Sequence, residues 1–438
     1  MVRLAIAALL GGLAVAGSAA AATQTVTWQT ATATRARVAY GAGGLYLYSP
    51  RETTPTTSHT AALTDLAPGT TYQWAAGTQT GSFTTAPLDP DARFGTEGTH
   101  VTADGSLFFP VLAYWQCSST DAQAVAAGIS IFMQSPYTGC QRARPNDFGT
   151  DPAPSSVRVL SDTYTPGAAG SAGWYLPDEP DGWGLTPAQL PVLPPAAATG
   201  RLRVVNVSQH FYSGQAPLNP TFDRSEYVRF AALGDLIGFD MYPIEKFCGR
   251  VSLLDVYRAQ HELMTTYAPG KPTFQWIETG DMTGECTTME ITPAIVNAES
   301  WLAVAGGACG LGYFTNSWTG ALWNRWDVSP AVDAQLAQTT AQLRGLAPAL
   351  CTGTPGDVTV PWDGSVAATS RTLNGAVYVI AVNASASPTT IPFRVDALLG
   401  RRLTLIGSTR MITPVKKVYF RDTFGPYEVH VYVAAPVG

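Results

Sequence analysis

Two glutamates, Glu179 and Glu278, stand where apolar, strand-like runs of the chain end and loops begin. Glu179 follows residues 173–176 within the segment WYLPDEPD, and Glu278 closes the run at residues 273–278. Hydrolysis of a glycosidic bond requires two carboxyl groups on opposite sides of that bond, one protonated to release the leaving oxygen and one ionised to attack the anomeric carbon. Glycoside hydrolysis is therefore the first hypothesis, provided that the fold brings these two strand ends together.

Eight such runs lie between residues 107 and 350, and segments of helical periodicity separate most of them. This alternation is typical of a (β/α)8 TIM barrel, in which active-site residues follow the C-terminal ends of the strands and strands four and seven lie on facing sides of the mouth. We expect the third helix to be missing, because the chain before residue 173 is too short for a crossover helix. The expected strands are residues 107–115, 128–134, 157–160, 173–176, 202–208, 236–242, 273–278 and 311–316, and the expected helices are 224–233, 253–267, 293–305 and 330–346.

The segments on either side of the expected barrel alternate in short β-like pieces. In the first, Leu66 to Tyr72 reads L-x-P-G-T-x-Y and resembles a fibronectin type III domain, in which Tyr72 would form the tyrosine corner. We therefore predict a multidomain chain, a central TIM barrel flanked by two all-β sandwich domains. The predicted units are a signal peptide at 1–22, a fibronectin type III-like sandwich at 23–88, the catalytic barrel at 89–350 and a C-terminal sandwich at 351–438.

The glutamate in an x-E-P motif after strand four and the second at the tip of strand seven resemble the retaining glycoside hydrolases of clan A. The resemblance implies that Glu179 is the acid/base and Glu278 the nucleophile of a double displacement. It also implies that Tyr242 lies beside the nucleophile and that Trp318 forms an aromatic floor for a sugar. One residue departs from the pattern, since Asp178 replaces the usual Asn before the acid/base, which points to an unusual sugar or an unusual substituent at the carbon that this Asn contacts.

Further polar and aromatic residues stand at the same expected strand ends. Glu285 and Glu290 compete with Glu278, and Gln134 is a further candidate at the end of strand two. The predicted substrate-binding residues are Asp178, His210, Asp240, Tyr242, Trp276 and Trp318, and the tryptophans of the mouth-forming loops, expected in part to stack on sugars, are Trp115, Trp183, Trp276, Trp323 and Trp326.

The amino-acid composition argues against two classes of binding partner. The 26 basic and 32 acidic residues give a net charge of −6, which leaves no basic field for nucleic acid or an anionic membrane. Arg3, an apolar run at residues 4–15 and small residues up to 22 form a secretory signal peptide, too short to span a membrane. We therefore expect a secreted monomer that needs no cofactor, does not insert into a membrane and acts on carbohydrate.

Six cysteines in an oxidising compartment predict three disulfides, and strand positions select the pairs. Cys117 and Cys140 follow neighbouring strands at the mouth, and Cys248 and Cys286 do so on the other side. Cys309 precedes the last strand and Cys351 follows the last helix, which places both at the bottom of the barrel.

Two other classes of function remain open. A carbohydrate-binding or adhesive protein could keep the barrel and its aromatic residues without turnover, although it would not need both glutamates. Asp178, Glu179 and Asp181 could instead hold a hard cation in a metal-dependent hydrolase. Neither a phosphate-binding loop nor a dinucleotide glycine fingerprint occurs in the sequence.

Overall fold

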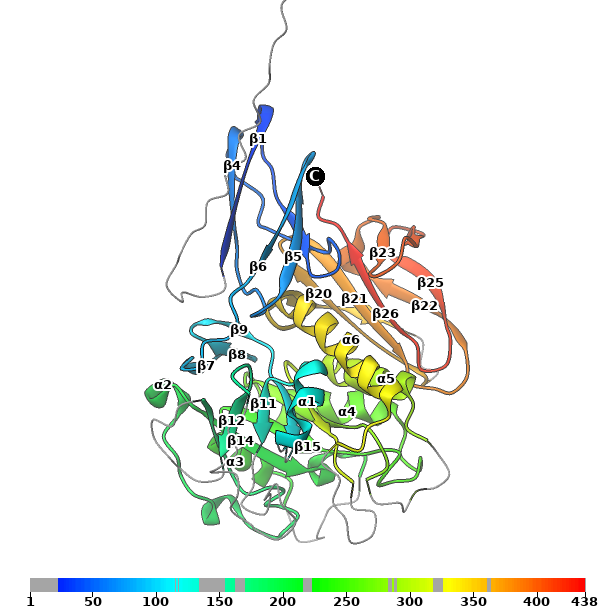
Figure 1. The fold of residues 1–438 in the computed structure, drawn as a ribbon. Coiled ribbons are helices and arrows are strands. Elements are labelled where there is room, and N and C mark those ends of the chain that lie inside the picture. Colours follow the sequence, from blue (N-terminus) through cyan, green and yellow to red (C-terminus); the bar gives the residue numbers. More distant parts are fainter. Residues whose placement is uncertain are drawn as a thin grey trace, which may run out of the picture.

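The computed structural model describes residues 23–114, 116, 118–133, 154–161, 170–215, 223–282, 286, 290–317, 326–360 and 364–437. Its centre is a closed barrel of eight parallel strands in chain order, with antiparallel sheets before and after it (Figure 1). This confirms the predicted fold class. The barrel strands are β10 (Val111–Tyr114), β11 (Ile131–Met133), β12 (Arg158–Ser161), β13 (Ser171–Tyr175), β14 (Leu202–Ser208), β15 (Leu236–Asp240), β16 (Thr273–Glu278) and β17 (Leu311–Phe314).

The predicted first strand, residues 107–115, was wrong in its extent. Pro110 divides it, because proline has no N–H to donate to a strand ladder. The chain before Pro110 forms an antiparallel sheet that the sequence did not predict, of order β7-β8-β9. Its strands are β7 (Phe94–Glu97), β8 (His100–Ala103) and β9 (Ser106–Phe108).

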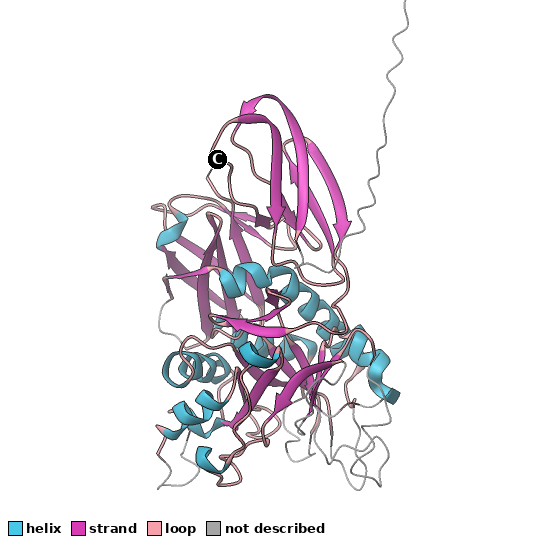
Figure 2. Cartoon of the chain, turned by 90° about the vertical axis from the view of Figure 1, so that its left-hand side faces the viewer, coloured by secondary structure: helices cyan, strands magenta, loops and turns pink. Residues whose placement is uncertain are grey.

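The helices surround the barrel (Figure 2). All four predicted helices are present, and the 253–267 segment ends in a π-helical turn. The connection from β12 to β13 is residues 162–170, of which 162–169 lie outside the described residues. The helical elements are η1 (Ser118–Thr120), α1 (Asp121–Ala126), η3 (Pro187–Gln189), α2 (Ala196–Thr199), η4 (Gln209–Phe211), α3 (Glu226–Leu233), α4 (Leu254–Glu262), η5 (Leu263–Tyr267), α5 (Pro293–Ala305), α6 (Pro330–Ala347) and η6 (Pro348–Thr352).

The first β unit contains a two-stranded ribbon, β1-β4, and a sheet of order β3-β2-β5-β6. The Tyr72 hydroxyl accepts the Ala67 N–H at 2.9 Å, which is the contact expected of a tyrosine corner. The assignment of this unit to a named domain family stays a prediction. Its strands are β1 (Gln24–Thr34), β2 (Ala39–Gly41), β3 (Leu47–Tyr48), β4 (Thr56–Leu63), β5 (Thr71–Ala76) and β6 (Gln79–Thr84).

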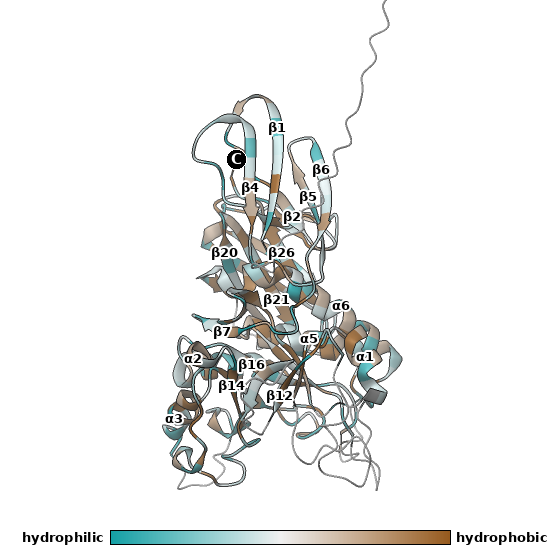
Figure 3. Cartoon of the chain, turned by 60° about the vertical axis from the view of Figure 1, so that its left-hand side comes forward, coloured by the Kyte–Doolittle hydropathy of each residue, from teal (hydrophilic) through white to brown (hydrophobic). Residues whose placement is uncertain are grey.

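The last β unit has two sheets, of order β18-β20-β21-β26-β23-β24 and β19-β22-β25, which share a hydrophobic core. The larger sheet also packs on α4 and α5, so the unit is joined to the barrel by apolar contacts. Figure 3 shows how strongly hydrophobic residues gather in the barrel strands beneath it. Its elements are β18 (Thr354–Gly356), β19 (Val358–Thr359), β20 (Val366–Leu373), β21 (Ala376–Asn383), β22 (Thr389–Val395), η7 (Asp396–Leu398), β23 (Leu403–Leu405), β24 (Met411–Ile412), β25 (Tyr419–Phe424) and β26 (Val429–Ala434).

Gly173 allows the close approach of β13 to β14. Its φ is +149°, and a Cβ atom at this position would lie 2.0 Å from the carbonyl oxygen of Leu202. Only glycine lacks that atom, so the sequence requires Gly173 here if β13 is to pair with β14. This pairing places the chain that follows, residues 176–179, beside the end of β14.

Two of the three predicted disulfides are present. Cys248 and Cys286 are bonded with a Cα–Cα distance of 5.0 Å, and Cys309 and Cys351 with one of 5.7 Å. Cys117 and Cys140 lie outside the described residues, as does the predicted signal peptide. Among the helices of the described ranges, none is long and apolar enough to cross a membrane.

Candidate active site

Asp178 and Glu179 lie at the C-terminal end of the barrel, just beyond β13. The N–H of Glu179 donates to the Asn206 carbonyl on β14 at 3.1 Å, and its φ is +42°. This left-handed conformation is uncommon for a residue other than glycine, and such strained positions gather at functional sites. The turn therefore holds two successive carboxyl groups at the mouth.

Asn206 joins the carboxyl groups of two different strand ends. Its Nδ2 donates to Asp178 Oδ1 at 2.9 Å and to Asp240 Oδ2, at the end of β15, at 3.0 Å. The hydroxyl of Tyr114, at the end of β10, donates to the other oxygen of Asp178 at 2.5 Å. The Asp240 carboxyl is also a hydrogen-bond partner of Glu179. Asp178, Glu179 and Asp240, which we call the carboxyl cluster, thus form one connected group.

The carboxyl cluster holds protons well above the pH at which isolated carboxyl groups lose them. Burial, followed by the charges of Asp178 and Asp181, raises the pKa of Glu179 to about 7, although Lys246 and the bond to Asp240 oppose the rise. Burial and the charges of Glu179 and Asp178 raise the pKa of Asp240 well above its usual range. Burial raises the pKa of Asp178 too, against the donors Tyr114 and Asn206. We infer that Glu179 and Asp240 share a proton at neutral pH while Asp178 is the member best stabilised as an anion.

Asp181 anchors the turn that carries the carboxyl cluster. It is fully buried and accepts hydrogen bonds from the Ser208 N–H at 2.9 Å, the Ser208 hydroxyl at 2.5 Å and the Tyr227 hydroxyl at 2.7 Å. Protein donors therefore occupy both of its oxygens. Within the ranges that the structure describes, no three His, Cys, Asp or Glu side chains are arranged to hold a metal ion, which leaves the cation hypothesis without support there.

His210 contacts the residues that hold Asp181 rather than the carboxyl cluster. Its Nδ1 lies 2.6 Å from the Ser208 hydroxyl, and burial lowers its pKa. Its recorded contact is thus with a group that also binds Asp181. The expected substrate contact of His210 stays a prediction.

Two of the predicted sugar-binding aromatic residues are covered. Trp276 is 1% exposed and packs edge-on against Tyr114, with ring centroids 5.6 Å apart, so it supports the cluster from inside the barrel and presents no free face to a sugar. Tyr242 is also buried, and its hydroxyl donates to Asp240 Oδ1 at 3.2 Å. The resemblance to clan A implied that Tyr242 lies beside Glu278, whereas the recorded hydrogen bond of its hydroxyl is to Asp240. Trp183 is different, because it is 79% exposed, and its backbone N–H donates to the Glu179 carbonyl at 3.1 Å.

Glu278 occupies the end of β16, as predicted, but its carboxylate has other partners. It is fully buried and accepts the N–H groups of Ile244 at 2.9 Å and Glu245 at 2.7 Å. Its charge also acts on Glu299 of α5, whose pKa burial and Glu278 raise well above the usual range. None of these partners belongs to the carboxyl cluster. The contacts of the described residues thus connect Glu179 with Asp178 and Asp240, and the pairing of Glu179 with Glu278 stays a prediction.

Several other predicted residues fall outside the described ranges. These are Trp115, Gln134, Glu285, Trp318 and Trp323. Glu290 is described and exposed, and the indole N–H of Trp326 donates to Asp333 at 2.8 Å, a contact outside the cluster.

The sequence analysis missed Asn206, Tyr114 and Lys246. Asn206 did carry a signal, because it is a polar residue within an otherwise apolar run, RVVNVS, that was predicted to be a buried barrel strand. A buried amide needs polar partners, so its position near the strand end could have indicated a site. Tyr114 and Lys246 carried no comparable signal.

Comparisons with known proteins give only distant likenesses. No protein-family model matches the chain, and no curated protein sequence matches it. Among solved structures, a proposed alpha-galactosidase from Bacteroides fragilis is 12% identical with a TM-score of 0.47, covering 95% of this chain and 96% of that one. A family 39 glycoside hydrolase from Bacteroides cellulosilyticus is 12% identical (TM-score 0.42; 93% and 97% covered), and a GH30 endoxylanase from Clostridium papyrosolvens is 10% identical (TM-score 0.40; 79% and 98% covered). Such values are too low to assign a function, so we argue it from the chain's own residues.

Proposed function

We propose that the chain is a secreted glycoside hydrolase that cleaves bonds of a polysaccharide or glycoconjugate with retention of configuration, and that Glu179 is its general acid and base. The observation that carries the proposal is the contact of Glu179 with Asp240 at the C-terminal end of the barrel, where burial and neighbouring charges raise the pKa of Glu179 to about 7. A carboxyl group that keeps its proton near neutral pH can protonate a leaving-group oxygen. An isolated surface glutamate cannot.

The members of the carboxyl cluster have different roles in the proposed reaction. The proton of Glu179 passes to the glycosidic oxygen as the bond to the anomeric carbon breaks, and positive charge develops on the sugar ring. Asp178, an anion held by Tyr114 and Asn206, stabilises that charge. The exposed ring of Trp183, next to the same turn, offers a stacking surface for a sugar.

The second carboxylate decides the stereochemistry. A double displacement needs it as a nucleophile, and the resemblance to clan A gives this role to Glu278. Each oxygen of Glu278 accepts one backbone N–H, from Ile244 or from Glu245, and keeps a lone pair with which it could attack a sugar. We therefore keep Glu278 as the proposed nucleophile and test Asp178 as the alternative.

The test is hydrolysis of a panel of polysaccharides and aryl glycosides by the wild type, Glu179→Gln, Asp178→Asn and Glu278→Gln. The exposed Glu97 of β7 provides the matched control, Glu97→Gln. We expect Glu179→Gln to lose at least a hundredfold on alkyl or sugar leaving groups but far less on dinitrophenyl glycosides, because a good leaving group needs no proton. Activity of Glu179→Gln equal to that of Glu97→Gln on every substrate would refute the assignment.

Product analysis separates the nucleophiles. NMR of the first-formed sugar reports retention or inversion. Azide should yield a glycosyl azide of inverted configuration only from the variant that lacks the attacking carboxylate, because an acid/base variant would yield one of retained configuration. An inverted azide from Glu278→Gln would assign the role to Glu278, and one from Asp178→Asn would assign it to Asp178. A binding protein without turnover would give no product with any substrate, while Trp183→Ala would still weaken sugar binding.

A further inference from the structure

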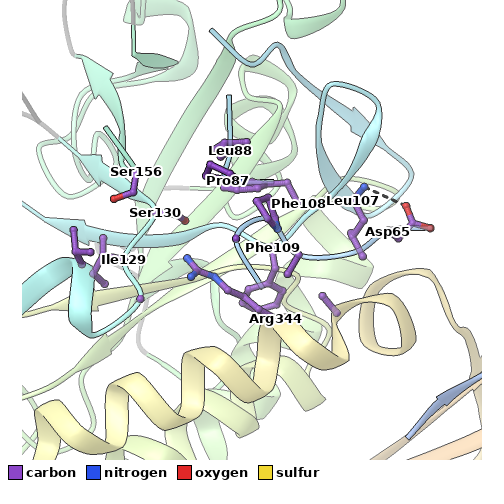
Figure 4. Close-up of a pocket in the computed structure, with 16 residues that line it drawn as sticks. Asp65, Pro87, Leu88, Leu107, Phe108, Phe109, Ile129, Ser130, Ser156 and Arg344 are labelled. Carbon is purple, nitrogen blue, oxygen red and sulfur yellow. Dashed lines mark hydrogen bonds between the residues drawn. The ribbon is translucent and has the colours of Figure 1, made fainter. Parts of the chain in front are cut away.

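A pocket lies at the end of the barrel opposite to the carboxyl cluster; Figure 4 shows the residues that line it. It has a volume of about 210 Å³. Its walls come from the chain just before β10 and β11, from the linker at Pro87 and Leu88, and from α6. Because these segments precede the barrel strands, the pocket opens at the N-terminal end of the barrel. It does not depend on the proposed hydrolase function.

In its described lining, the pocket combines apolar walls with the cation of Arg344. Leu88, Phe108 and Ile129 form part of the apolar lining, and Arg344 of α6 lies among them. Figure 4 shows the guanidinium of Arg344 extending toward Ser130 and Ile129 rather than along its own helix. The carboxylate that lines the pocket, Asp65, accepts the Leu107 N–H at 3.2 Å and lies apart from Arg344.

Among the residues that the structure describes, Arg344 differs from the other covered arginines in having no polar partner. Within the described ranges it makes no hydrogen bond or ion pair, and its recorded electrostatic neighbour is the hydroxyl of Tyr313. By contrast, Arg203 pairs with Asp235 at 2.8 Å, and Arg158 donates to the Leu88 carbonyl at 2.9 Å. Burial lowers the pKa of Arg344 to about 10, so it is still charged at neutral pH. A half-buried cation without a partner is costly unless something supplies the missing anion.

We propose that this pocket binds a small organic carboxylate, with its carboxylate on Arg344 and its apolar body against Leu88, Phe108 and Ile129. The planar guanidinium presents donors that match a carboxylate in a bidentate pair. The volume exceeds the roughly 150 Å³ of an engineered cavity known to take up benzene, so a single ring or a short chain fits. An inorganic anion would pair with Arg344 but leave the apolar walls uncovered.

Calorimetric titration of the full chain with benzoate tests the proposal, with benzyl alcohol and sulfate as comparison ligands. We expect saturable binding of benzoate to one site, and at least tenfold weaker binding of the neutral alcohol and of sulfate. Arg344→Met should lower benzoate affinity at least tenfold. The matched control is Arg229→Met, which removes an exposed arginine of α3 that pairs with Glu226.

A stability measurement separates a ligand-binding role for Arg344 from a structural one. Because Arg344 has no polar partner within the described part of the chain, Arg344→Met should unfold at the same urea concentration as the wild type or a higher one. The exposed Ser156 lines the pocket, and Ser156→Trp should obstruct it with Arg344 intact, which also provides a test if Arg344→Met fails to fold. The proposal is overturned if benzoate, phenylacetate and hexanoate all fail to bind at about 10 mM, an affinity weaker than about 3 kcal/mol. It is also overturned if sulfate binds as well as benzoate, or if Ser156→Trp binds benzoate like the wild type.

Discussion

Replacement of Asp178 by asparagine should lower the pKa of Glu179. The charge of Asp178 is the second cause of the raised pKa, after burial, and asparagine keeps the shape of the side chain and an acceptor for Tyr114 while removing that charge. The burial of Glu179 and its bond to Asp240 stay as they are. Because asparagine has a single acceptor oxygen, the variant removes the charge of Asp178 together with its hydrogen bond from Asn206.

The size of the change follows from the pKa of Glu179. A pKa of about 7 instead of 4.5 corresponds to about 3.4 kcal/mol at 1.36 kcal/mol per unit. Burial supplies the largest part of this rise in the pKa of Glu179. Because Glu179 is partly exposed, solvent screens the charge of Asp178, and we assign that charge about one pKa unit, or about 1.4 kcal/mol. The pKa of Glu179 in Asp178→Asn should then be about 6.

Carbon-13 NMR titration of glutamate carboxyl groups measures this pKa without a substrate. Glu179→Gln identifies the resonance by its disappearance, and the exposed Asp91, replaced by asparagine, is the control for a general change in charge. The high-pH fall in kcat/KM should move by the same amount, because the acid must be protonated to act. A Glu179 resonance that titrates near 4.5 in the wild type, or one that Asp178→Asn leaves unmoved, would refute the electrostatic reasoning.

The pKa of Glu299 is raised well above its usual range, so the folded chain holds a proton that the unfolded chain releases above about 4.5, and stability falls as pH rises. Glu299→Gln should therefore gain stability over the wild type between pH 5 and pH 8 in urea unfolding; an equal pH dependence would contradict this. Replacement of Cys309 and Cys351 by serine opens a loop with a sequence separation of 42 and should cost about 3–4 kcal/mol, measured in the same way against the disulfide-bonded wild type. Tyr227→Phe removes a 2.7 Å donor from buried Asp181 and should cost about 1.5–3 kcal/mol, whereas a loss below 0.5 kcal/mol would show that water replaces it.

The barrel could be predicted because its strands are continuous apolar runs. β14 and β16 have the predicted bounds, residues 202–208 and 273–278, since strands buried on both faces need no polar alternation. The first strand was too long because an apolar run continues across Pro110, and apolar character alone does not show where a ladder changes sheet. The sheet β7-β8-β9 was missed because its strands are short and belong to neither of the predicted β units.

The carboxyl cluster could be predicted only in part. Glu179 was found from its position at a strand end, and Asp178 and Asp240 were identified as candidates in the same way. The connection between Asp178 and Asp240 depends on Asn206. Its amide donates to Asp178, 28 positions earlier in the chain, and to Asp240, 34 positions later. Such a bridge exists only after three strands have paired, so no local pattern contains it.

Glu278 shows how far inference from strand ends reaches. Barrel geometry places the backbone of the last residue of β16 at the mouth, and the sequence predicted this correctly. The direction of its side chain depends on which donors are within reach. Ile244 and Glu245, which follow β15, offer two adjacent N–H groups, and each donates a charge-assisted hydrogen bond to one oxygen of the buried Glu278 carboxylate. These donors come from the loop after a neighbouring strand, so no pattern local to β16 contains them. The role of Glu278 as nucleophile stays a prediction, which the configuration of the glycosyl azide from Glu278→Gln tests.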